Sequence, residues 1–289
     1  MQTLGRRIVV AAFDGWNDAG EAATGAVRML REEGDLSPAF AVDPELYFDY
    51  QYTRPHIEAD GEGGRTLRWP DATLHRPAAG IGDVWFWTIT GNEPARAWRS
   101  FAGEFVDRAL AEDITGLVTL GSMMSDVPHT RPISVFASSE NAAVREQLGL
   151  ERSTYEGPVG ILSVLGDAAE RAGIPTLSLW ASVPHYVAGH TPSPKATLAL
   201  LEKLEELTGA VVPKGTLATD AATWEATIDA AAADDEDMSD YIRQLEQTRD
   251  TVDSPDASGD AIAQAFERYL HRDDPRDGRD PRDGRGDRR

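Results

Sequence analysis

Hydrophobic positions follow two different periods along the chain. The run Ile8–Phe13 is apolar at every position, which is typical of a strand buried on both faces of a sheet. The segment Ala95–Glu112 instead repeats apolar residues at helical spacing, so that one face carries Trp98, Phe101, Phe105 and Ala109. The two patterns alternate up to the helix that ends near Leu207, as they do in βαβ units.

The same criteria locate the other elements of this region. We expect further strands at Ala39–Val42, Leu46–Tyr50, Thr66–Trp69, Asp83–Thr90, Gly116–Leu120, Ile133–Ala137 and Thr176–Val183. Helices are expected at Gly20–Glu33, Ser139–Leu148, Val159–Ala172 and Ser193–Leu207. This order predicts an α/β fold with a mostly parallel sheet.

The chain changes character after this region. We divide it into an α/β core domain at 1–212, an acidic helical appendage at 213–270 and a disordered tail at 271–289. Between Asp220 and Asp260 there are 13 acidic residues and 2 arginines, a net charge of −11. The tail repeats the hexamer Asp-Pro-Arg-Asp-Gly-Arg and has too few apolar residues to build a core. Helices in the appendage are expected at Ala218–Ala233, Glu236–Thr248 and Gly259–Leu270, with a linker at Asp250–Ser258.

Composition narrows the classes of function. The 289 residues include no cysteine, which excludes disulfides, thiolate metal sites and cysteine nucleophiles. The net charge of −21 opposes binding to nucleic acid and to anionic membranes. Arg6 and Arg7 precede an apolar run that is shorter than the roughly 7–15 residues of a signal peptide, so we expect a cytoplasmic protein. No apolar stretch approaches the roughly 20 residues of a membrane span.

Three loops follow predicted strands at the carboxyl edge of the sheet, where open parallel sheets bind ligands. In the first loop, Asp18 and Glu21 fit a capping box at the start of a helix. A ligand or metal cradle that uses Asp14, Asn17 and Asp18 is the alternative interpretation. No cap requires Asp14 or Trp16, so both remain candidates for binding.

The first loop also argues against phosphate chemistry. Asp14, Asp18 and Glu21 crowd the start of the helix, and no basic residue precedes Arg28. Carboxylates at that position repel a phosphate dianion, although a helix N-terminus otherwise attracts one. The sequence contains neither a P-loop nor a complete GxGxxG motif.

The second loop has the richest chemistry. It carries the candidates Asp126, His129 and Arg131 together with Ser122, from which a Ser/His/Asp triad could be drawn. We do not favour a triad, because triad partners normally come from separated segments and the Gly-x-Ser-x-Gly elbow is missing.

The third loop adds the candidates His185 and Tyr186, with His190 five residues after the first histidine. Together with Asp14 or Asp126 these histidines could hold a metal, but their spacing is not that of a known zinc motif. Loop histidines more often form hydrogen bonds with the backbone, so we expect no metal and no cofactor.

Taken as a set, these motifs resemble a known family. Phe-Asp-Gly-Trp-Asn-Asp-Ala-Gly at 13–20, the loop at 121–132 and Pro-His-Tyr-Val-Ala-Gly-His at 184–190 are similar to the actinobacterial branch of the proteasome assembly chaperone 2 family. The resemblance spans about Arg7–Thr208 and extends loosely through the helices to Leu270. It implies a phosphorylase/hydrolase-like fold similar to that of purine nucleoside phosphorylases, with a mostly parallel, mixed sheet wrapped by helices. It also implies oligomers and a link to the 20S proteasome. Archaeal relatives can end in a hydrophobic-Tyr-x tail that docks into the proteasome. The sequence ends Gly-Asp-Arg-Arg, so we do not expect that docking mode.

Three functional hypotheses remain. The leading one is a non-enzymatic binding protein, related to proteasome assembly chaperones, whose partners are proteasome subunits or another protein. The alternative is a small-molecule hydrolase or transferase whose pocket is lined by Asp14, Asn17, Asp126, His129 and His185. The third is a self-associating scaffold that forms homo-oligomers through apolar residues such as Trp16, Met123 and Met124.

Overall fold

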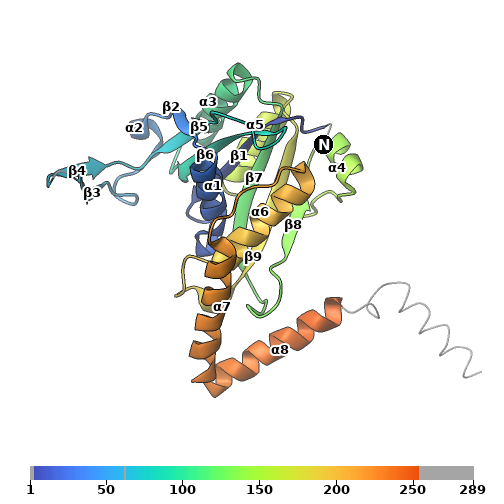
Figure 1. Ribbon diagram of the computed structural model, residues 1–289. Coiled ribbons are helices and arrows are strands. Elements are labelled where there is room, and N and C mark those ends of the chain that lie inside the picture. The colour runs from blue at the N-terminus through green and yellow to red at the C-terminus, as the bar shows by residue number, and fades with distance from the viewer. Residues whose placement is uncertain (1–2, 62, 254–289) are drawn as a thin grey trace, which may run out of the picture.

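A seven-stranded mixed sheet forms the centre of the molecule (Figure 1). The computed structural model describes residues 3–61 and 63–253. The strand order is β2-β5-β6-β1-β7-β9-β8, and the four central strands β6, β1, β7 and β9 are parallel. Strands β2, β5 and β8 pair antiparallel at the two sides. The strands of this sheet are β1 (Arg7–Asp14), β2 (Ser37–Ala41), β5 (Ala72–Arg76), β6 (Trp85–Asn92), β7 (Gly116–Ser125), β8 (Val135–Ser138) and β9 (Thr176–Pro184). The predicted mostly parallel, mixed α/β sheet is confirmed.

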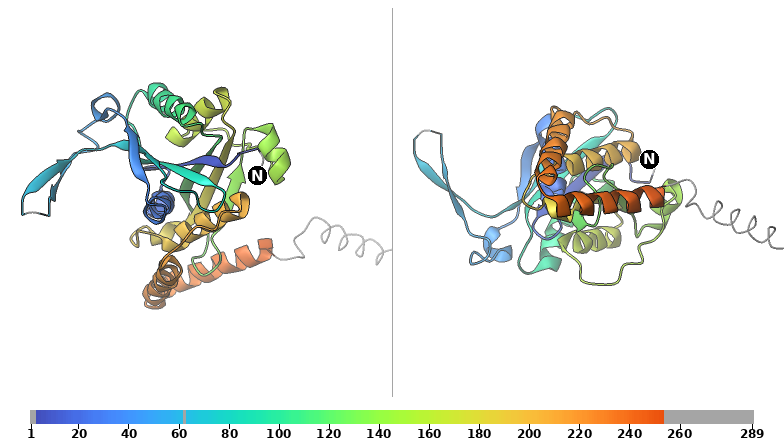
Figure 2. Two further views of the ribbon diagram at one scale, coloured as in Figure 1. Left: turned by 45° about the horizontal axis from the view of Figure 1, so that its top comes forward. Right: turned by 90° about the horizontal axis from the view of Figure 1, so that it is seen from below.

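Helices cover both faces of this sheet (Figures 1 and 2). Apolar side chains of α1 and α6 pack with β1, β7 and β9 on one face, and α7 adds Trp224 and Ile228 to the same cluster. Helices α3 and α5 pack on the other face. The longer helices are α1 (Ala22–Glu33), α3 (Trp98–Ala111), α5 (Ile161–Arg171), α6 (Pro194–Thr208), α7 (Leu217–Ala233) and α8 (Glu236–Asp253). The shorter helical elements are η1 (Ala19–Glu21), α2 (Pro44–Tyr47), α4 (Ala142–Leu148) and η2 (His185–Val187).

The segment between β2 and β5 differs from the prediction. The expected strand Leu46–Tyr50 is wrong, because this region begins as α2, with Pro44 in its first turn and the Asp43 carboxylate accepting a hydrogen bond from the Glu45 amide. Its apolar residues Tyr47 and Phe48 are buried, so they reflect packing rather than a strand. The helix is followed by a separate two-stranded hairpin, β3 (His56–Ala59) and β4 (Arg65–Arg68), which projects from the body (Figure 1).

The end of the described chain also differs from the prediction. Helix α8 continues to Asp253, so the expected linker at Asp250–Ser258 does not begin where it was placed. The expected helix Gly259–Leu270 and the tail lie outside the described residues. Within the described ranges, none of the helices combines the length and apolar character that crossing a membrane requires.

Phe101 of α3 tests the packing of the α3–α5 face. Its buried ring makes edge contacts with Phe13, Tyr47 and Phe105, at centroid distances of 5.6, 5.3 and 5.0 Å. Phe101→Ala should lower the free energy of unfolding by about 3–5 kcal/mol, because it leaves a cavity among these rings. Leu110→Ala, an exposed position of the same helix, is the matched control and should change it by less than about 1 kcal/mol. Denaturant unfolding measures both; equal losses would show that Phe101 does not anchor this face.

Candidate functional site

The carboxyl edge of the parallel strands carries all eight candidate residues, but in two separate groups. The β1–α1 loop holds Asp14, Trp16 and Asn17. The β7–β8 loop and the start of the β9–α6 connection hold Asp126, His129, Arg131, His185 and Tyr186. The two groups have different neighbours, and each contains both buried and exposed residues.

The first group is fixed by amide and carboxylate contacts. Asn92 Nδ2 donates to Asp14 Oδ2 at 2.6 Å, and the buried Asn17 donates from Nδ2 to Glu93 Oε1 at 3.3 Å. Burial raises the pKa of Asp14, against the hydrogen bonds that lower it. The same Glu93 oxygen accepts the Ile161 amide of α5 at 2.9 Å. This loop is therefore tied to the start of α5.

Asp18 acts as a helix cap, as one of the two interpretations predicted. Its Oδ1 accepts the amides of Ala23 and Thr24 at 2.8 and 3.1 Å, and its Oδ2 accepts the Thr24 hydroxyl. The reciprocal half of the capping box is missing, because the exposed Glu21 has a left-handed φ of 49° and the Asp18 amide bonds to Gly15 instead. The predicted capping box is therefore wrong in its second half, because Glu21 does not bond to the Asp18 amide.

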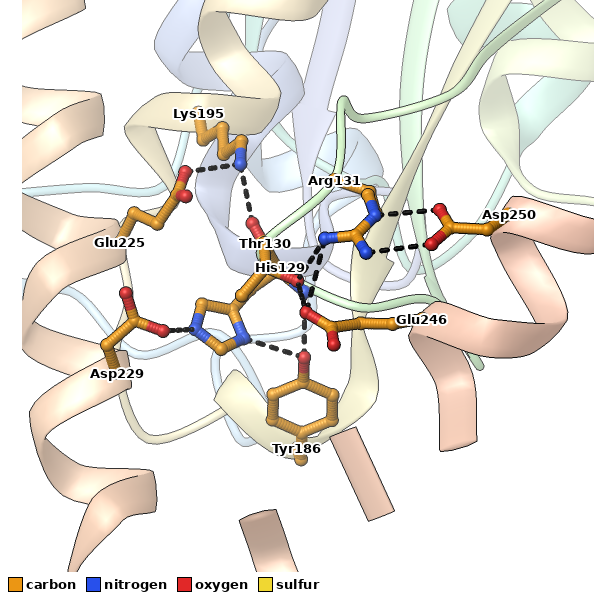
Figure 3. A network of polar contacts seen from close by, with 9 residues as sticks. All are labelled: His129, Thr130, Arg131, Tyr186, Lys195, Glu225, Asp229, Glu246 and Asp250. Atoms are coloured by element: carbon orange, nitrogen blue, oxygen red, sulfur yellow. Dashed lines mark hydrogen bonds and ion pairs between the residues drawn. The ribbon is translucent and has the colours of Figure 1, made fainter. Parts of the chain in front are cut away.

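His129 lies at the centre of the second group (Figure 3). Its side chain is fully buried, with Nδ1 2.8 Å from the Tyr186 hydroxyl oxygen and Nε2 3.0 Å from Asp229 Oδ1 of α7. The Tyr186 oxygen also accepts the His129 amide at 2.7 Å. Because burial raises the pKa of Tyr186 to about 12, its hydroxyl is protonated at neutral pH and donates to Nδ1. The imidazole then carries its proton on Nε2 and donates to Asp229.

Lys195 of α6 joins the loop to α7 a second time. Its Nζ donates to the His129 carbonyl oxygen at 2.5 Å and pairs with Glu225. Glu225 and Asp229 are four residues apart on α7, so one face of that helix receives both contacts (Figure 3).

Arg131 reaches the last described helix, α8 (Figure 3). Its Nε and Nη2 bond to the two carboxylate oxygens of Asp250 at 2.8 Å each, and its Nη1 lies 3.2 Å from Glu246 Oε1. Arg131 lowers the pKa of Asp250, and Asp250 in turn raises the pKa of Arg131. Thr130 donates to the same Glu246 oxygen. The pair is partly exposed, so solvent screens it and its contribution to stability is small.

Side-chain burial holds α8 more strongly than this ion pair. Ile242 and Leu245 are both buried, and each buried aliphatic side chain contributes roughly 1.5–3 kcal/mol. Tyr241 adds edge contacts to His185 and Tyr186, with ring centroids 5.7 and 6.2 Å apart. Helix α8 thus contacts the second loop through polar groups and the third through the ring of Tyr241, and the burial of Ile242 and Leu245 adds the larger part of its attachment.

His185 and Asp126 remain at the surface beside this cluster. His185 Nδ1 lies 3.2 Å from Asp126 Oδ1, and both side chains are substantially exposed. In the described part of the chain, His, Asp and Glu side chains nowhere gather in threes as a metal site requires.

The residues of the hydrolase or transferase alternative do not share one pocket. A half-open groove of about 840 Å³ is lined by Asp14 but not by Asn17, Asp126, His129 or His185. The buried Ser122 donates its hydroxyl to the Ala19 carbonyl at 2.9 Å. His129 is enclosed by its own partners and offers no surface to a substrate. The geometry therefore gives no support to the triad or to a five-residue catalytic pocket.

Reasoning from sequence missed the partners on α6, α7 and α8. These are Lys195, Glu225, Asp229, Glu246 and Asp250. The acids occur in two pairs spaced four residues apart, which places each pair on one helical face. That spacing was the available signal, but it does not say which loop the acids meet.

Comparisons with known proteins give the class of this fold. The model of the PAC2 family matches residues 12–232, and the chain belongs to the PAC2 family. The resemblance seen in the sequence is thereby confirmed. A search of the curated proteins found no match.

Solved structures agree with this assignment. A PAC2 family protein from Streptomyces avermitilis is 40% identical with a TM-score of 0.74, over 81% of this chain and 98% of that one. A proteasome-assembly chaperone homologue from Mycobacterium tuberculosis is 39% identical with a TM-score of 0.73, over 81% and 99% of the two chains. An archaeal proteasome activator from Pyrococcus furiosus is 14% identical with a TM-score of 0.63, over 78% and 93%, and shows the shared fold alone.

The attachment of α8 gives a first prediction for this site. Leu245→Ala should speed hydrogen exchange across α8 by at least about tenfold, because it removes a buried anchor worth about 2 kcal/mol or more. Arg131→Gln should speed it by no more than about fivefold, since its ion pair is partly exposed. Arg243→Gln, which breaks only a local pair with Asp240, is the control and should have no effect. A larger effect from Arg131→Gln than from Leu245→Ala would reverse this ranking.

His129 gives a pH prediction. Burial lowers the pKa of His129 below its unfolded value of about 6.5, so the unfolded chain takes up this proton at a higher pH than the folded chain. The stability that neutral His129 contributes is therefore complete above about pH 6.5 and is lost as the pH falls below it. His129→Gln should lower Tm at pH 8 and show a smaller further decline between pH 8 and pH 5 than the unmodified chain. Identical declines in thermal denaturation would contradict a neutral, buried His129.

Proposed function

We propose that this protein is a non-enzymatic binding protein that assists protein-complex assembly, with proteasome subunits as its partners. Its family and its 39% identity to a structure described as a proteasome-assembly chaperone homologue support this partner class. A proteasome partner implies a cytoplasmic location. The observation that carries the proposal is a group of exposed apolar side chains at the carboxyl edge.

This group, the apolar rim, consists of Trp16, Met123, Met124 and Val159, which are 65, 40, 44 and 47% exposed. Three of its members adjoin Asn17 or one of two residues that contact Asn17. The Ser122 amide donates to the Asn17 carbonyl at 2.8 Å, and Gly160 packs so closely on Asn17 that an added Cβ would lie 2.1 Å from Asn17 Nδ2. Trp16, Met123 and Val159 each stand one residue from one of these three. Aromatic and methionine side chains gathered on a rigid edge are typical of protein interfaces.

The closed second group supports the same function. His129, Arg131 and Tyr186 of this group are occupied by internal contacts that involve α7 and α8, so they are not available to a substrate. Self-association through the same rim is the second candidate, because Trp16 and the two methionines suit a second copy equally well. Sedimentation of the purified chain distinguishes the two hypotheses. The scaffold hypothesis requires an oligomer that dissociates when residues of the apolar rim are substituted.

Binding to proteasome subunits provides the test. The tagged full chain, incubated with separately purified proteasome subunits of Mycobacterium tuberculosis, should retain at least one of them. The double variant Trp16→Ser, Met124→Ser should weaken retention by about tenfold or more, because exposed apolar anchors carry interface energy. The control is Leu110→Ser, an exposed leucine on α3. Failure of the unmodified chain to retain any subunit would contradict the proposed partner, and equal loss in the control would contradict the rim.

A further inference from the structure

The groove of about 840 Å³ lies between α1 and the β3–β4 hairpin, and none of the four residues of the apolar rim lines it. One wall is α1 and the other is β2 together with the hairpin, which Figure 1 shows on the β2–β5 side of the sheet. Its floor is formed by β5 and by the end of β6. A volume of this size is in the range of pockets that enclose small molecules.

The floor of the groove is polar, although the same strands are apolar on their other face. Thr73 of β5 pairs across the strands with Thr90 of β6, and both line the groove, as does His75. The alternate residues Leu74 and Ile89 pack in the core of the α3–α5 face. A sheet face built from hydroxyls and an imidazole offers hydrogen bonds to a polar ligand.

Charges are separated along the length of the groove. Asp14 and Asp71 lie at one end, where the backbone of Asn92 bonds to Asp71 and pairs with Asp14. Four residues further along β5, His75 lies near Arg31 of α1, whose charge adds to burial in lowering the pKa of the imidazole. Because a strand rises about 3.3 Å per residue, the acidic and basic ends are about 13 Å apart.

Several groups at the basic end lack protein partners. His75 is 7% exposed, and its Nδ1 is buried without a hydrogen-bond partner among the described residues. Arg28 of α1 also lines the groove, one helical turn before Arg31, and within residues 3–61 and 63–253 it has no ion pair and no side-chain hydrogen bond. Arg31 has only a 4.0 Å contact to Glu32. Buried polar atoms are normally satisfied, so an unpaired nitrogen in an imidazole close to Arg31, beside guanidinium groups without a close carboxylate partner, points to a ligand.

We propose that this groove binds a short free peptide of about four residues, with its ammonium group at Asp14 and Asp71 and its carboxylate at Arg28 and Arg31. An extended chain of four residues spans about 13 Å, which matches the separation of the two charged ends. The peptide backbone lies over Thr73 and Thr90, whose hydroxyls both donate and accept. Binding involves no chemical step and uses none of the apolar rim.

Isothermal titration of the full chain with tetra-alanine and its blocked forms tests the proposal. Free tetra-alanine should bind, whereas N-acetylation or C-terminal amidation should each weaken binding by about tenfold or more, because each removes a charge-assisted hydrogen bond. The proposal is overturned if the free peptide does not bind, if the doubly blocked peptide binds as well as the free one, or if only one of the two blocks matters.

A matched pair of arginine variants locates the binding. Arg31→Gln should weaken binding of free tetra-alanine by about tenfold and leave the affinity for the amidated peptide unchanged. Arg99→Gln, an exposed arginine on α3 across the sheet, is the control and should leave both affinities unchanged. Equal effects of the two variants would place binding outside the groove. Retention of proteasome subunits is expected to be unaffected by Arg31→Gln, so failure of one proposal is distinguishable from failure of the other.

Discussion

The buried imidazole of His129 is the contact on which the carboxyl edge of this sheet depends. It joins the β7–β8 loop to Tyr186 after β9 and to Asp229 on α7, three segments that are otherwise far apart in sequence. Taking a histidine out of water favours its neutral form, and the two hydrogen bonds offset the loss of hydration. Loss of one partner leaves a buried polar atom unsatisfied, at a cost of about 1–3 kcal/mol. Because the loss of either partner is costly, the network stabilises the attachment of Tyr186 and α7 to the β7–β8 loop.

The His129 network divides the carboxyl edge of the sheet into two parts with different surfaces. On the side of α7 and α8, the candidate residues His129, Arg131 and Tyr186 are consumed by internal bonds, with Arg131 bound to α8. On the other side, Trp16 and the methionines of β7 are exposed, and beyond them lies the polar groove that begins at Asp14. His129, Arg131 and Tyr186 suggested an active site in the sequence, but in the structure they stabilise the fold. The surfaces that are open to partners carry apolar side chains and, in the groove, arginines without a close carboxylate partner.

The sequence was informative where one local pattern determined the structure. The six apolar residues of Ile8–Phe13 became the buried centre of β1, and the helical stripe through Phe101 became the packed face of α3. Prediction from the sequence failed where a buried apolar residue does not lie in a strand. Tyr47 is buried in a helical turn capped by Asp43, so its apolar character was mistaken for a strand. Strand β5 was missed because Thr73 and His75 face the groove and break the apolar run.

The candidate site was predictable in its loops but not in its partners. Each loop follows a parallel strand, so the topology alone brings them to one edge. The bonds that decide their role join residues 100 and 119 positions apart, His129 with Asp229 and Arg131 with Asp250. No local pattern encodes such a pairing, because it depends on where α6 directs the two helices that follow.

The state of the His129 ring tests the central claim, that this network closes the edge, most directly. Nitrogen-15 NMR of the full chain at pH 7 reports which ring nitrogen carries the proton and how fast it exchanges. The account predicts a neutral ring protonated at Nε2, with slow solvent exchange and a hydrogen bond to Asp229. A ring that is positively charged, protonated at Nδ1 or in fast exchange with water would show an open edge and contradict it.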